Sequence, residues 1–177
     1  MAEQPDALRE CCTRLEQLIA PYRGRVEYGN LRSHVSSWES ADCPRVTNIA
    51  LVYETPGGST DQINICYSSG TGEFTLLDED LKELVTRDVE AVIEKVKPRI
   101  LDIPAKRRRH LEEEIRRHLD QGMSSKALVA HFTRVLQSEL KGGTITHLEL
   151  RDAMTFAIRY ATQLQEAANA AESPPGP

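Results

Sequence analysis

The densest run of positive charge in this chain lies at residues 106–109, and further arginines follow within the same predicted helix. The six residues are Lys106, Arg107, Arg108, Arg109, Arg116 and Arg117. The first turn of a helix carries partial positive charge, so each cation placed there is unfavourable by about 0.3–1 kcal/mol. Binding of an external anion, either a phosphate group or an acidic protein surface, would explain the placement. We therefore take these six residues as candidate binding residues.

Pairing within one helix is the alternative interpretation of the same run. Carboxylates lie three or four residues from several of the arginines, and the possible pairs are Arg108–Glu112, Arg109–Glu113, Glu113–Arg116 and Glu113–Arg117. Residues at this spacing are neighbours on a helix surface. Exposed ion pairs contribute about 0–1 kcal/mol each, so they could form a solvated face that binds nothing. Both interpretations stay open at this point.

Nucleic-acid binding is a second candidate function, through the basic helix 104–120. Residues 111–132 also fit two helices joined at Gln121-Gly122-Met123, as in a helix-turn-helix motif. A recognition helix needs hydrogen-bond donors along an exposed face, and the second helix offers only Lys126 and Arg134. The net charge of −5 excludes a surface that is basic all over but leaves room for a local cationic patch.

Catalytic, metal and cofactor signatures are weak in this sequence. Four histidines fall in the helical part, but without the H-E-x-x-H unit or a comparable ligand set. The four cysteines, Cys11, Cys12, Cys43 and Cys66, lack C-x-x-C spacing, which favours ordinary reduced thiols. The two glycine loops lack the phosphate-binding pattern G-x-x-x-x-G-K-[ST]. We expect no cofactor and no metal, and an enzyme of unknown class is our third alternative.

The six candidate binding residues must be positioned by the folded chain, which is predicted to begin with a helix from Asp6 to Pro21 followed by a small sheet. Residues 25–39 alternate loosely between apolar and polar side chains, and residues 49–53 are nearly continuous in apolar ones. The latter pattern predicts a central strand covered on both faces. Residues 62–67 and 73–77 complete an antiparallel meander of three to four strands, with turns at 55–60 and 68–72.

A long helix is predicted to follow, capped by Asp78 and stopped by Pro98. The resulting order, helix–meander–helix over residues 6–97, resembles the layout of the double-stranded-RNA-binding fold. That family carries basic residues at the start of its second helix. This chain reads Asp78-Glu79-Asp80-Leu81-Lys82-Glu83 there, which would repel phosphates. The resemblance therefore implies the layout and not the activity.

Three helices joined by glycines follow, over residues 104–120, 124–140 and 146–168. Thr146 and Glu149 fit a capping box at the start of the last one. The fold class is thus α+β: an antiparallel meander packed against flanking helices, then a C-terminal three-helix unit. We expect domains at 1–98 and 99–168, and a disordered tail at 169–177.

Composition is that of a soluble globular protein, with 40% hydrophobic and 28% charged residues. No stretch approaches the roughly 20 apolar residues that span a bilayer, so we expect a cytoplasmic protein without membrane contact. The function that these observations favour is non-catalytic. We expect an interaction or regulatory protein whose helical C-terminal unit binds another protein or a second copy of the chain.

Overall fold

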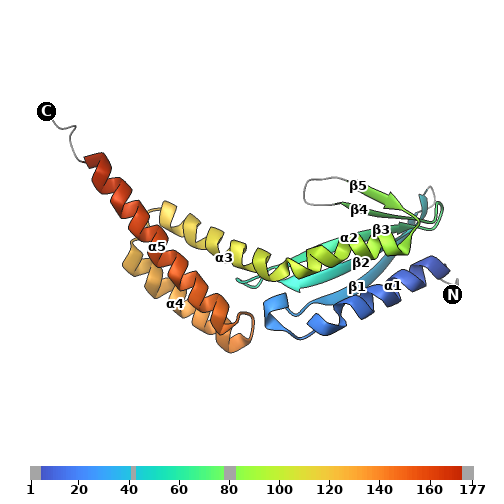
Figure 1. Cartoon of the computed structure of the whole chain (residues 1–177), viewed down its shortest axis with the longest axis horizontal. Coiled ribbons are helices and arrows are strands. Elements are labelled where there is room, and N and C mark those ends of the chain that lie inside the picture. Colours follow the sequence, from blue (N-terminus) through green and yellow to red (C-terminus); the bar gives the residue numbers. More distant parts are fainter. Residues whose placement is uncertain (1–4, 41–42, 78–82, 173–177) are drawn as a thin grey trace. The chain divides into compact units, whose positions relative to one another are not determined.

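The computed structural model describes residues 5–40, 43–77 and 83–172, and its architecture is the predicted α+β class (Figure 1). An N-terminal helix precedes a five-stranded antiparallel meander in the order β1-β2-β3-β4-β5, and four helices follow in this part of the chain. The bounds are α1 (Asp6–Ile19), β1 (Arg32–Ser40), β2 (Cys43–Glu54), β3 (Thr60–Ser68), β4 (Glu73–Leu77), β5 (Glu83–Thr86), α2 (Val89–Leu101), α3 (Ile103–Asp120), α4 (Ser125–Gly142) and α5 (His147–Glu172). Two short 3-10 helices, Ala20–Tyr22 and Val26–Tyr28, connect α1 to β1.

The chain divides into two compact units. The first comprises residues 1–55 and 59–104, and the second comprises residues 56–58 and 105–177. We call them the sheet unit and the helical unit. Among the described residues, no helix is long and apolar enough to cross a membrane.

In the sheet unit, α1 and α2 pack on one face of the sheet. The alternation of β2 and β3 sends Ile49, Leu51, Ile63 and Ile65 toward these helices, and all four are buried. The opposite face carries half-buried polar residues such as Asn48 and Asn64. Asn48 Nδ2 donates a hydrogen bond to Asn64 Oδ1 at 3.3 Å. Residues 49–53 were predicted to be covered on both faces, but α1 and α2 lie on the same side of the sheet, and Val52 on the other side is only half-buried.

The predicted helix start at Asp78 falls outside the described residues, and the helix itself begins later than expected. Residues 83–86 form β5, which pairs with β4, and Asp88 caps α2 by accepting a bond from the Glu90 amide at 2.9 Å. Val85 is half-exposed on this strand instead of facing the core from a helix. Short apolar runs fit both strand and helix periods, and here pairing with β4 decides.

Pro98 does not end α2, which continues to Leu101. A proline inside a helix removes one hydrogen bond. Ile100 and Ile103, on either side of the junction with α3, are fully buried. Burial of two such side chains contributes about 1.5–3 kcal/mol each, which offsets the lost bond.

The helical unit encloses its own core, formed by one apolar face of each of its helices. Among the residues whose side chains are described, the buried apolar ones in this core are Leu111, Ile115, Leu119, Leu136, Ile145, Ala153 and Ala157. The capping box predicted at the start of α5 is confirmed. The Glu149 carboxylate accepts from the Thr146 amide at 2.7 Å, and the Thr146 hydroxyl accepts from the Glu149 amide at 3.1 Å. Residues 169–172, predicted as tail, belong to α5, and residues 173–177 lie outside the described part.

Candidate functional site

The six candidate cations all lie on α3, but the helix turns them in different directions. Arg107 is fully buried and Lys106 is half-buried, whereas the other four are exposed: Arg108, Arg109, Arg116 and Arg117. Since a helix repeats every 3.6 residues, four consecutive residues point to all sides of it. The run therefore does not form one cationic surface.

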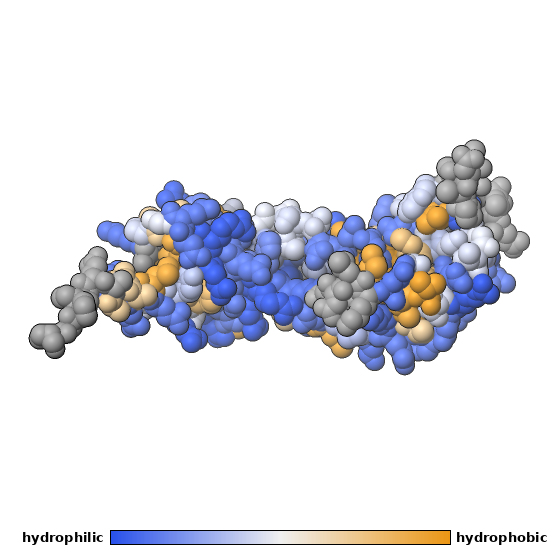
Figure 2. Space-filling model, turned by 90° about the horizontal axis from the view of Figure 1, so that it is seen from above, coloured by the Kyte–Doolittle hydropathy of each residue, from blue (hydrophilic) through white to orange (hydrophobic). Residues whose placement is uncertain are grey.

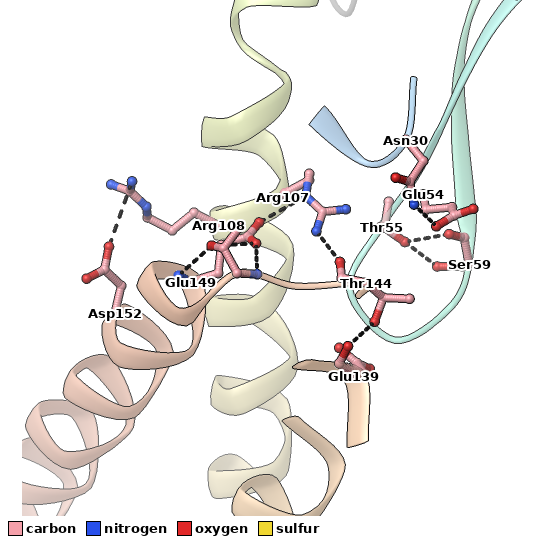
Figure 3. A network of polar contacts seen from close by, with 11 residues as sticks. Asn30, Glu54, Thr55, Ser59, Arg107, Arg108, Glu139, Thr144, Glu149 and Asp152 are labelled. Atoms are coloured by element: carbon pink, nitrogen blue, oxygen red, sulfur yellow. Dashed lines mark hydrogen bonds and ion pairs between the residues drawn. The ribbon is translucent and has the colours of Figure 1, made fainter. Parts of the chain in front are cut away.

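Arg107 is the centre of a buried polar network that ties α3 to the start of α5 (Figure 3). Its Nε donates to Glu149 Oε1 at 2.9 Å, and its Nη2 donates to the Thr144 carbonyl oxygen at 2.6 Å. Glu149 is only 8% exposed, and its other oxygen, Oε2, accepts the capping bond from the Thr146 amide. Arg107, one of the six candidate binding residues, is therefore not on the surface, because the buried carboxylate of the capping box needs a cation beside it.

Two further arginines bind side chains of α5. Arg108 Nη2 lies 3.8 Å from Asp152 Oδ2 (Figure 3). The Arg116 guanidinium lies over two aromatic rings, 5.7 Å from the centroid of Phe156 and 5.4 Å from that of Tyr160. These distances are those of cation–π contacts.

The Tyr160 hydroxyl extends this contact back to α3. It donates to Asp120 Oδ1 at 2.9 Å, and this bond raises the pKa of Tyr160. The two rings stack with their centroids 5.8 Å apart. Arg116 thus holds α3 and α5 together instead of offering a free charge.

The charge that remains exposed on α3 is mixed. Arg109 and Arg117 are exposed, and so are Glu113 and Asp120 on the same helix. Across residues 105–177, eleven Lys and Arg stand against nine Asp and Glu, a net charge of +2, whereas the rest of the chain has eleven against eighteen, a net charge of −7. The helical unit is therefore the less acidic part of the chain, without a continuous basic patch along α3.

Glu139 on α4 carries a carboxylate whose pKa is raised. Burial raises its pKa, a bond from the Gly57 amide at 2.8 Å lowers it, and the nearby charge of Glu114 raises it again. Its second oxygen, Oε2, is buried without a hydrogen-bond partner. A lone carboxylate of this kind gives pH sensitivity, but by itself it provides no reaction centre.

Chemistry based on thiols or metals finds no support in the described residues. Burial raises the pKa of Cys11 to about 12 and also raises those of Cys12 and Cys66, which lowers the thiolate fraction on which cysteine reactivity depends. No group of three or more His, Cys, Asp and Glu side chains in this part of the chain is arranged to hold a metal ion.

An apolar seam runs along α5, and the sequence predicted an apolar face there but not that its outer end is uncovered. From Leu150 onward, apolar residues recur at alternating intervals of four and three: Leu150, Met154, Ala157, Ala161, Leu164 and Ala168. This is the heptad spacing with which helices pair along their length. The first four pack into the core of the helical unit, but every residue from Thr162 to Ala170 is exposed. Figure 1 shows this end of α5 continuing past the ends of α3 and α4.

Other large apolar side chains exposed on the helical unit are Val135, Leu148 and Ile158. Leu148 is 51% exposed and Ile158 is 59% exposed, yet they lie ten positions apart along α5. On the face seen in Figure 2, apolar residues form small separate patches on a largely hydrophilic surface. Scattered residues of this kind are ordinary in soluble proteins. The α5 seam differs because its spacing is regular.

Comparison with known proteins gives no relative from which a function could be carried over. The chain matches no protein-family model, no curated protein and no solved structure.

Proposed function

We propose that this protein is a non-catalytic interaction protein whose helical unit binds a helix of a partner along the outer part of α5. The observation that carries the proposal is the heptad seam, which continues through Leu164 and Ala168 where α3 and α4 no longer cover it. A helix packed along this seam would cover Leu164, which is 36% exposed. Alanines in such a seam allow two helices to approach closely.

Two further observations support a helix as the ligand. α5 is 26 residues long, whereas α3 and α4 are 18 residues each, so its outer part lacks neighbours from its own unit. Its end is rich in alanine, the residue with the highest helix propensity. This part of α5 is thus able to stay helical while its seam remains available to a partner.

A substitution on the seam, compared with one beside it, tests the proposal. Leu164→Glu places a charge on the seam, whereas Gln163→Glu adds the same charge to the adjacent exposed position outside it. We expect both variants to retain the parent circular dichroism spectrum, since both sites are exposed. Binding partners recovered from lysate should be lost with Leu164→Glu and retained with Gln163→Glu. Equal binding by both variants, or no association of the parent chain, would refute the proposal.

Anion binding by α3 is the second candidate, and the segregation of charge between the two units favours it. The helical unit has a net charge of +2 and presents Arg109 and Arg117 on its surface. Nucleic acid bound through these residues would dissociate as salt is raised, because binding releases counterions from the phosphates. Titration of duplex DNA and duplex RNA at several salt concentrations tests this function. Absence of binding at low salt, or binding insensitive to salt, would exclude it.

A further inference from the structure

Strand β1 is an edge of the sheet with an open hydrogen-bonding side. It has nine residues and pairs with β2, and in the described residues no backbone hydrogen bond joins it to any other element. At the usual rise per residue, nine residues present about 30 Å of backbone. Natural proteins generally protect such edges with proline, charge, strong bulges or a covering element, because an open edge can pair with another strand.

Protection of β1 is slight over its central part. The described register with β2 is regular from Arg32 to Trp38, and the irregularity lies beyond it, between Trp38 and Ser40. The strand contains no proline and no lysine. Two large apolar side chains on it are exposed to solvent, Val35 at 43% and Trp38 at 54%.

The two exposed apolar side chains lie on opposite faces of the sheet. Val35 is opposite the buried Ile49 of β2, so it lies on the face that carries the helices. Trp38 is three positions further along and therefore lies on the open face, as Arg32 does. A strand added at this edge covers both Val35 and Trp38 only if it carries an apolar side chain on the helix-bearing face and a side chain able to contact an indole ring on the open face.

We propose that the edge of β1 pairs with β1 of a second copy, antiparallel and centred on Val35, to form one continuous sheet across two molecules. A twofold axis perpendicular to the sheet places the two Val35 side chains opposite each other on the helix-bearing face. On the open face, the same register places Arg32 of each copy opposite Trp38 of the other. Of the aromatic rings, the indole of tryptophan gives the most favourable cation–π contact, and arginine is the cation most often found in such contacts.

The residues that this register places opposite each other distinguish it from the registers centred one residue to either side. Centring on Ser36 would put Val35 opposite Ser37, and centring on His34 would put two ionisable imidazoles opposite each other. The Val35-centred register places no like charges opposite each other between Arg32 and Trp38, and it covers both exposed apolar side chains at once. Within its own sheet, Arg32 Nη1 lies 3.5 Å from Glu54 Oε1 on β2. This ion pair holds the guanidinium on the open face.

Disulfide trapping with a matched control tests this interface. In a background with Cys12→Ser, Cys43→Ser and Cys66→Ser, one variant adds Val35→Cys and the other adds Ser37→Cys. Opposed residues of antiparallel strands have Cβ atoms about 4.5–5.5 Å apart, within reach of a disulfide after a small adjustment. In the proposed register Ser37 faces Ser33 of the second copy, and its own counterpart is about 13 Å away along the strand.

We expect Val35→Cys to form a covalent dimer on mild oxidation, and Ser37→Cys and the background chain to remain monomeric. Trp38 is the single tryptophan of the chain, so its emission should shift to shorter wavelength as the unmodified protein is concentrated. That shift, and the dimer seen by sedimentation, should be absent in Val35→Lys. The fluorescence and sedimentation of the unmodified chain do not depend on whether any variant folds.

Three results would overturn the proposal. The first is a parent chain that sediments as a monomer at every concentration, and the second is equal trapping of Val35→Cys and Ser37→Cys. The third is a dimer that persists in Val35→Lys but is lost in Leu164→Glu, because association would then use the α5 seam. That last outcome would support the proposed function while excluding the β1 interface.

Discussion

Replacement of Arg107 by methionine should destabilise the helical unit strongly. The change keeps most of the apolar stem but removes the cation that bonds to Glu149 Oε1 and to the Thr144 carbonyl. The Glu149 carboxylate, 8% exposed, would remain as a charge without its partner. Breaking a buried ion pair from one side costs about 3–5 kcal/mol, a large part of the roughly 5–15 kcal/mol that stabilises an ordinary domain.

The double variant Arg107→Met/Glu149→Gln separates the cost of an unpaired charge from the loss of contacts. Glutamine keeps a carbonyl oxygen that can accept from the Thr146 amide, so the cap at the start of α5 remains. With both charges gone, the double variant should be more stable than either single variant, with a coupling of about 1–3 kcal/mol. A hydrophobic replacement of a buried pair is often tolerated for this reason.

Thermal and urea unfolding followed by far-ultraviolet circular dichroism measure these differences. A change of about 1 kcal/mol moves the midpoint of a 60–100-residue unit by about 4–8 °C, so Arg107→Met should lower it by more than about 10 °C. Trp38 lies in the sheet unit, and its fluorescence gives the transition of that unit separately. Arg117→Met, at an exposed site on the same helix, is the control and should change stability by less than about 0.5 kcal/mol. A cost below about 1 kcal/mol for Arg107→Met, or simple additivity in the double variant, would refute this reasoning.

Two other predictions concern the helical unit. Burial raises the pKa of the Glu139 carboxyl from 4.5, so the folded state binds the carboxyl proton more tightly than the unfolded chain does. The free energy of unfolding should therefore fall as pH rises from about 4.5 through the raised pKa of the folded state. Glu139→Gln should flatten this part of the stability–pH curve measured by urea unfolding, and an unchanged slope would contradict the assignment. Arg116→Ala should cost about 0.5–1 kcal/mol through loss of its contact with Phe156 and Tyr160, whereas Arg117→Ala should be nearly neutral. Equal unfolding midpoints for these two variants would show that the ring contact does not contribute.

Several local sequence signals predicted the correct elements, although the helix start at Asp78 and the helix end at Pro98 were wrong. The helix–sheet–helix order, the hairpin turns and the Thr146–Glu149 capping box all follow from spacing and turn chemistry within a few positions. The number of strands did not follow, because residues 83–86 carry an apolar run that suits either a strand or a helix. Hydrogen bonding to β4, a non-local contact, selected the strand.

The candidate site illustrates the same division. Sequence alone singled out six cations on one helix, and it could not assign Arg107 to the interior, because the partner that draws it there lies 42 positions away. Nor did it show that Arg116 lies against the rings of α5. The signal for the α5 seam was present in the sequence, in the regular spacing that continues to Ala168, but whether that spacing is covered depends on where α3 and α4 end.

The sequence by itself therefore determined the α+β class, the apolar faces of the helices and the cap at the start of α5. These features rest on periodicity and on hydrogen bonds within about four residues, which local composition encodes. Only the tertiary structure decided which charges are buried, which sheet face is open and which strand edge is unpaired. Burial is set by the elements that pack against a residue, and those elements come from distant parts of the chain.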